Sequence, residues 1–363
     1  EHKVDLDGTV VLIKGTQSDP ITVDTDMTSA RTRLRTFAQS VQRSFMKVAR
    51  AMRTAYLTHG HGEVNDKAKE QKDVDGAGSA AGLKDYLTRL NYTVKDLGMA
   101  QGLAQDVPED ATIVLVLGPR KPFLDEELAA LDRYLARGGA LLVAMDPVGE
   151  TKLGPLEARL GVRYEPVPLA DDKVFYPARH NAGDHRWLVA TQFSSHASLT
   201  QLSTIRAGTG LLFVDSGSLV DAPAVPGAVG PPPKKTYVIK SMASTFADLN
   251  GNNELDEGTE KRATFNLVAA VERGKLAGAM DKKAPKETKE NERGMRAVML
   301  ADADLVGDFV LGGSQLNRVL VADVINWLGG EEQLAGETQS EKDVAILHTR
   351  NKDVAWFYST IFG

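Results

Sequence analysis

The sequence contains no cysteine, which excludes disulfide bonds, thiolate metal sites and a cysteine nucleophile. It has no run of about 18 apolar residues and no recognisable signal peptide, so no segment has the composition of a membrane-spanning helix. The net charge is −6, and no basic stripe with interleaved aromatic residues is present. The charge pattern therefore argues against a nucleic-acid-binding surface.

The sequence also lacks the short motifs of several enzyme classes. There is no G-x-S-x-G nucleophile elbow, no P-loop and no G-x-G-x-x-G fingerprint. Ser216 follows an apolar run, but the sequence indicates no particular histidine as its base. These absences leave no complete catalytic set.

The composition is that of an ordinary globular protein, with 42% hydrophobic and 25% charged residues in 363. Because residue 1 is Glu, we expect the chain to be a piece or a processed product of a longer protein. We predict three parts along it. Residues 1–27 are remnant strands of an upstream domain, 28–335 form an α/β domain with insertions at about 160–210 and 220–295, and 336–363 form a tail.

Continuous apolar runs predict strands that are buried on both faces, as in a parallel sheet. The clearest are Ala111–Leu117, Ala140–Met145 and Ala297–Leu300, and helices are predicted at Asp125–Arg137 and Gln315–Leu328. Alternating patterns between residues 162 and 214 predict antiparallel additions. The expected fold class is therefore α/β, with a mostly parallel sheet flanked by helices. Tyr56, Leu115 and Val143 are expected to share that sheet.

A second group of predicted elements lies before the first buried strand. Thr9–Ile13 and Ile21–Val23 are rich in β-formers and predict a hairpin or two short edge strands. Ser29–Arg53 predicts an amphipathic helix whose apolar positions recur every three or four residues, at Leu34, Phe37, Val41, Phe45 and Val48. Its other face is basic, which is compatible with a packed helix or with one lying on a membrane surface.

The stretch Ala55–Glu63 (AYLTHGHGE) predicts a buried strand that ends in a glycine-rich loop. The carboxyl ends of parallel strands meet at one edge of a sheet, where ligands bind in open α/β folds. The residues expected there are Gly60, His61, Gly62, Glu63, Asp146, Asp302 and Asp304. They form either a ligand or partner groove or simply the polar ends of strands.

Two metal sites are conceivable from spacing. His59, His61 and Glu63 alternate, so a continuing strand would place them on one side; a structural loop is the alternative reading. The stretch 248–256 (DLNGNNELD) has the oxygen spacing of a calcium loop, although the twelfth position is Thr259 rather than Glu. The predicted calcium ligands are Asp248, Asn250, Asn252, Glu254 and Asp256. A metal-free turn between strands is the alternative.

Three segments together resemble a known family. AYLTHGHGE, the stretch from VLVLGPRKPFLDEE to GGALLVAMDP, and AVMLADADLV with the later Asn326-Trp327-Leu328 resemble the GldG-type auxiliary subunits of ABC transporters, which are linked to gliding motility. The resemblance implies a flavodoxin-like or class I amidotransferase-like sheet, related to a domain of an intraflagellar transport subunit. It also implies a domain on the periplasmic face of the bacterial inner membrane, held by flanking membrane helices absent from this chain. It implies no catalytic residues.

The residues and the resemblance together are compatible with three functions. The first is a non-catalytic, extracytoplasmic domain that binds ABC permease or ATPase subunits or other envelope proteins. The second is a hydrolase on an amidotransferase-like scaffold that uses His61, Glu63 and Asp146 or Asp302. The third is an adhesion or assembly domain stabilised by Ca²⁺ at residues 248–256.

Overall fold

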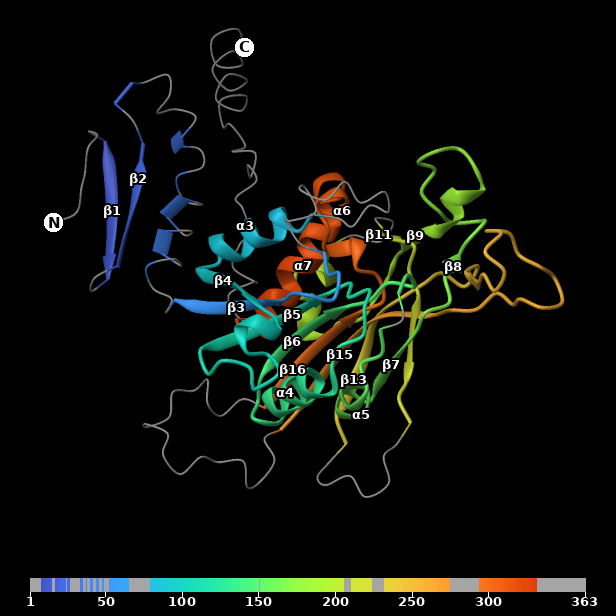
Figure 1. Cartoon of the computed structure of the whole chain (residues 1–363). Helices are drawn as coiled ribbons and strands as arrows, with labels where there is room; N and C mark the ends of the chain where they lie inside the picture. The colour runs from blue at the N-terminus through green and yellow to red at the C-terminus, as the bar shows by residue number, and fades with distance from the viewer. Residues whose placement is uncertain are drawn as a thin grey trace, which may run out of the picture.

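The computed structural model describes residues 8–14, 17–23, 25–26, parts of 33–48, 52–64, 79–149, 151–205, 210–223, 232–274 and 294–331. A ten-stranded sheet forms its centre (Figure 1). The strands of its parallel part, in spatial order, are β4 (Tyr92–Leu97), β3 (Arg53–Thr58), β5 (Ala111–Leu117), β6 (Ala140–Ala144) and β16 (Met295–Leu300). The prediction that Tyr56, Leu115 and Val143 share one sheet is therefore confirmed.

Antiparallel strands extend the sheet on the β16 side. They are β15 (Asn266–Arg273), β13 (Lys234–Lys240), β12 (Ser218–Asp221), β7 (Val162–Glu165) and β10 (Gln192–Phe193). Two further pairs lie outside this sheet: β9 (Trp187–Ala190) with β11 (Leu211–Val214), and β8 (Leu169–Ala170) with β14 (Phe246–Ala247). The mixed α/β class with antiparallel additions is thus confirmed. The strand expected at 174–176 is reduced to an isolated bridge between Phe175 and Leu188.

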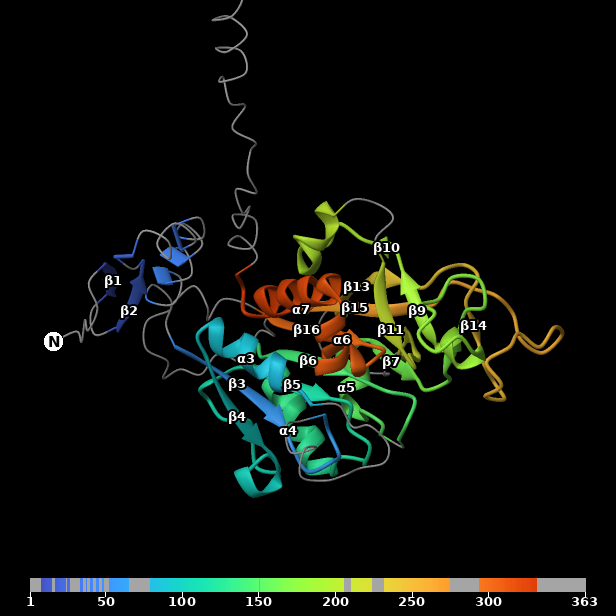
Figure 2. The ribbon, with the colours of Figure 1, turned by 90° about the horizontal axis from the view of Figure 1, so that it is seen from above.

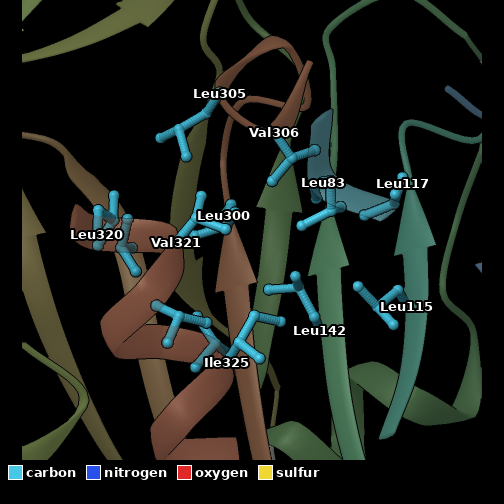
Figure 3. Packing of buried hydrophobic residues seen from close by; sticks show 14 of the residues in the cluster. Leu83, Leu115, Leu117, Leu142, Leu300, Leu305, Val306, Leu320, Val321 and Ile325 are labelled. Carbon is cyan, nitrogen blue, oxygen red and sulfur yellow. The ribbon is translucent and has the colours of Figure 1, made fainter. Parts of the chain in front are cut away.

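Helices cover both faces of the sheet (Figures 1 and 2). On one face lie α3 (Ala81–Arg89), α6 (Asp308–Gly313) and α7 (Gln315–Leu328), and on the other lie α4 (Asp125–Ala136) and α5 (Pro155–Leu160). Figure 3 shows Val321 and Ile325 of α7 packed over Leu300 and Leu142 of the sheet. Each side chain of this size removed from water contributes about 1.5–3 kcal/mol, so this layer is a main source of stability.

The strands before β3 do not belong to the central sheet. β1 (Thr9–Lys14) and β2 (Gln17–Thr22) form the predicted antiparallel pair, although β2 begins earlier than the sequence pattern suggests. The described residues between 33 and 48 are helical. The predicted apolar stripe is only partly buried: Val48 is buried, but Leu34 and Phe45 are 57% and 60% exposed, so spacing alone gave the wrong environment for them.

Several predicted features lie outside the described residues. The tail at 336–363 is one of them. The sequence also predicts a charged surface loop at 282–293 and a short strand at 343–347, and both lie outside the described residues as well. Within the described part of the chain, no helix has the length and apolar character needed to cross a membrane.

Candidate functional site

The order of the parallel strands places two loops side by side. After β3 the chain moves to β4 on one side, whereas β5 pairs with β3 on its other side. The loops that follow β3 and β5 therefore meet at the topological switch point of the sheet, where such folds bind ligands. The backbone amides of Arg120 and Lys121 both donate to the carbonyl of His61, at 2.8 Å. The glycine–histidine loop is thus fixed to the neighbouring loop.

His61, Glu63 and Glu127 form a buried carboxylate–histidine triad at this point. Nδ1 of His61 lies 3.0 Å from Oε1 of Glu63, and Nε2 lies 2.9 Å from Oε2 of Glu127. The same Glu127 oxygen accepts the backbone N–H of Leu124, the residue that precedes α4, at 3.0 Å. Phe123 packs on the imidazole, with ring centroids 4.0 Å apart.

The two carboxylates of the triad favour the protonated form of His61. Burial opposes the charge, but the hydrogen bond with Glu63 and the charges of both carboxylates raise the pKa of His61 above its usual value. Burial acts against ionisation of Glu63 too, yet the hydrogen bonds from His61 lower the pKa of Glu63. Both ring nitrogens contact a carboxylate, so neither is placed to take a proton from a substrate or a water. This geometry does not favour the hydrolase reading.

His59, His61 and Glu63 do not form the arrangement that the metal-site prediction requires. Glu63 turns back to accept the backbone N–H of His61 at 2.7 Å and to contact its ring. Among the described residues, no group of three or more histidine and acidic side chains is placed to hold a metal ion. The two glycines end the strand, so the alternation on which the site depends stops at Thr58.

Four aspartates form an acid cluster at the same edge of the sheet: Asp146, Asp215, Asp302 and Asp304. Oδ1 of Asp146 accepts the backbone N–H of Ala303 at 2.7 Å, which ties the loop after β6 to the loop after β16. Asp302 is fully buried and accepts the backbone N–H of Val214 at 2.6 Å. The predicted edge residues thus separate into the triad and this cluster.

Burial and mutual repulsion raise the pKa of three members of the acid cluster, Asp146, Asp302 and Asp304. Burial, followed by the charges of Asp146 and Asp304, raises the pKa of Asp302. Burial is also the largest cause at Asp146, whose pKa is raised despite the nearby Arg120. For Asp304, burial and the charges of Asp146 and Asp215 raise the pKa to about 7. Ionisation of this cluster near neutral pH therefore costs folding free energy.

Gly118 is the residue that lets these loops approach. It has a φ of +59°, and a Cβ atom there would lie 2.8 Å from the Cβ of Ala303. We predict that Gly118→Ala lowers the free energy of unfolding by about 2–4 kcal/mol, from backbone strain plus overpacking. Gly60→Ala is the control, because Gly60 also has positive φ, at +118°, but has open space around it. If denaturant unfolding gives the same loss of unfolding free energy for the two variants, the close approach of position 118 to Ala303 is unimportant.

The predicted calcium loop lies between β14 and β15. Its side chains bind the loop itself: Asp248 accepts backbone N–H groups of Gly251 and Asn253, and the Asn250 and Asn252 amides both donate to Asp256. Asn253 has φ +63°, so it takes the left-handed conformation that calcium loops usually give to glycine. Glu260 accepts the amides of Leu249 and Asp256 and closes the turn. Glu254 contributes only its backbone N–H, donated to Asn252.

Calcium binding to this loop stays a prediction. Because a ligand of the folded state alone stabilises it, about 1 mM Ca²⁺ should raise the thermal midpoint by a few degrees relative to a chelator. Asp256→Asn should abolish the shift, since it removes the carboxylate toward which both asparagine amides point. Identical thermal midpoints of the wild-type chain in Ca²⁺ and in chelator would rule out calcium binding by this loop.

Three aromatic side chains from separate segments form an exposed aromatic surface. The rings of Tyr176 and Trp187 stack with centroids 6.0 Å apart, and Phe309 of α6 meets Trp187 edge-on at 5.6 Å. Tyr176 and Phe309 are 52% and 70% exposed. Arg186, next to Trp187, pairs with Asp215 at 3.5 Å, so the aromatic surface borders the acid cluster.

Sequence reasoning identified some of these residues and missed others. His61, Glu63, Asp146, Asp302 and Asp304 do gather at the expected edge. Glu127 was missed, because its contact with His61 joins segments that are far apart in the sequence. Asp215 and the aromatic surface were also missed, because contacts between distant segments leave no local pattern.

A comparison with protein families gives a match over most of the chain. The family model described as "ABC-type uncharacterized transport system" matches residues 53–326. A search of curated protein sequences finds no match. Similar solved structures include the "mmIFT52 N-terminal domain", 14% identical with a TM-score of 0.49, which covers 76% of this chain and 96% of that one.

Two other solved structures are less alike. A putative thua-like protein from Bacteroides uniformis is 9% identical with a TM-score of 0.38, covering 76% of this chain and 91% of that one. A β-galactosidase from Bacillus circulans is 9% identical with a TM-score of 0.40, covering 85% of this chain and 36% of that one. Likenesses at this level do not extend to function.

Proposed function

Because the chain belongs to the ABC-type uncharacterized transport system family, we propose that it is a non-catalytic auxiliary domain that binds the membrane-embedded part of an ABC transporter. The proposal places the domain on the extracytoplasmic side of a bacterial inner membrane, as in GldG-type subunits. The family match supports the link to transport. The engaged nitrogens of His61 support a role without catalysis.

The strand order supports the finer assignment of the fold. Numbered along the chain, the five parallel strands lie in the order 2-1-3-4-5, which is the flavodoxin-like arrangement. Such a scaffold presents its variable loops at the carboxyl edge of the sheet. The triad and the acid cluster are largely buried beneath this edge, whereas Tyr176 and Phe309 of the aromatic surface are exposed to a partner.

The aromatic surface is the observation that carries the proposal. Tryptophan, tyrosine and arginine dominate the binding energy of protein interfaces, and this surface joins Trp187 and Tyr176 to Phe309 beside Arg186. At its border, Arg186 is paired with Asp215. We infer that the partner presents an apolar patch to this surface.

Co-purification with the membrane subunits of an ABC transporter from the same cells tests the proposal. The double variant Tyr176→Ala/Phe309→Ala should bind at least about tenfold more weakly, because each truncation removes an exposed contact that a partner covers. The control Val10→Ala/Leu124→Ala removes exposed apolar side chains elsewhere, which are 42% and 44% exposed. Equal recovery of the transporter with both double variants would rule out this surface.

A further inference from the structure

β4 is the outermost strand at one end of the central sheet (Figure 2). All six of its residues pair in register with β3, and no strand in the described part of the chain lies on its other side. The other outer strands are shorter, since β7 has four residues and β10 has two. β4 therefore presents a long and regular outer edge.

The hydrogen bonding with β3 shows which backbone groups of β4 face outward. The carbonyl of Leu97 accepts the backbone N–H of His59 at 3.1 Å, so the backbone groups of Leu97 face β3. Because successive residues direct these groups to opposite sides of a strand, those of Val94 and Asp96 face away from β3. These are the groups to which a further strand would bind.

β4 has few of the features that protect a sheet edge. Proline, β-bulges and lysine side chains normally prevent two edges from pairing. β4 contains no proline and no register shift. Its one lysine, Lys95, reaches back across β3 to Asp110, with Nζ 2.8 Å from Oδ2. By contrast, β13 near the other end of the sheet has three lysines and two register shifts. The edge of β4 is thus open to a partner strand.

The charges of β4 favour a second copy of the same edge. The strand carries one lysine and one aspartate, so it is neutral in a chain with a net charge of −6. An antiparallel pair with its two-fold axis at Val94 places Thr93 of one copy opposite Lys95 of the other. An axis at Lys95 or at Asp96 instead places two like charges opposite each other, which is destabilising.

We propose that the chain forms a two-fold dimer in which the β4 strands of two copies pair antiparallel about Val94. Each Val94 donates its N–H to the carbonyl of the other, and the two central sheets become one continuous sheet. The dimer does not depend on transporter binding, because the aromatic surface comes from other elements.

Sedimentation velocity of the whole chain between about 1 µM and about 200 µM tests the dimer. We expect the wild type to pass from the mass of one chain to that of two. Val94→Pro removes an N–H that β3 does not use, at an edge position where proline is tolerated, and should stay a single chain at the highest concentration. A wild type that never dimerises, or a Val94→Pro chain that dimerises equally well, would overturn the proposal.

Thr93 gives a matched pair of variants that test the register without changing the backbone of β4. Its side chain is exposed. Thr93→Glu places a carboxylate opposite Lys95 of the other copy and should lower the dissociation constant of the dimer at least about threefold. Thr93→Lys places two like charges opposite each other and should raise it at least about threefold.

Thr204 supplies the control for net charge. It is also exposed, and it lies outside β4, so Thr204→Glu and Thr204→Lys should each leave the dissociation constant within about twofold of the wild-type value. If Thr93→Glu and Thr93→Lys dimerise with equal affinity, the β4 strands do not pair about Val94 and the proposal is wrong.

Discussion

His61→Ala should lower the free energy of unfolding by about 3–5 kcal/mol, because it leaves two buried carboxylates without their shared cation. The side chains of Glu63 and Glu127 are 1% and 0% exposed, so water cannot replace the imidazole without opening the site. The loss should be measured by denaturant unfolding at pH 7, with the slope of the transition unchanged.

The neighbouring histidine supplies the control for this prediction. His59 lies in the same loop but is not a member of the triad. His59→Ala should lower the free energy of unfolding by less than about 1 kcal/mol. A His61→Ala chain as stable as His59→Ala would mean that the triad contributes nothing. The double variant His61→Ala/Glu63→Ala should be no less stable than His61→Ala, since it removes one of the stranded charges.

Asp304→Asn should stabilise the protein above neutral pH. The folded state raises the pKa of Asp304 from 3.8 to about 7, so between these values the folded chain holds a proton that the unfolded chain has lost. Wild-type stability therefore falls as pH rises through this window. At pH 8 the full cost is present, and the variant should be more stable by about 2–4 kcal/mol.

The pH profile distinguishes this effect from a general charge effect. Below about pH 4 the aspartate is protonated in both states, so the advantage of Asp304→Asn should vanish there. Asp96→Asn makes the same change in net charge at an exposed position, and should not alter the profile. A constant difference between Asp304→Asn and wild type across pH 4–8 would show that the cluster does not hold its protons as described.

Much of the sheet was predictable because its signals are local. Ala111–Leu117 and Ala140–Ala144 are continuous apolar runs, and the structure buries nearly every side chain in them. The helix at Gln315–Leu328 begins and ends at the residues that the sequence predicts. A parallel sheet then follows, and with it the gathering of strand ends at one edge.

The contents of the site were less predictable because they depend on pairing between distant residues. Glu127 meets His61 across 66 positions of sequence. Trp187 and Phe309 come from different elements, and each alone is an ordinary aromatic residue. Leu34 and Phe45 show a different limit of local patterns. Their spacing places them on the apolar face of a helix, but both side chains are exposed. Periodicity identifies a helix face but not whether another element covers it.

Residue-specific cross-linking tests the central proposal most directly, because a chain without cysteine gives no background. Phe309→Cys puts a single reactive thiol on the aromatic surface, and Glu109→Cys puts one just before β5, at the opposite edge of the sheet. In membranes that contain the transporter, our account predicts a cross-link from position 309 to a membrane subunit and none from position 109. Cross-linking from 109 but not from 309, or from neither position, would contradict it.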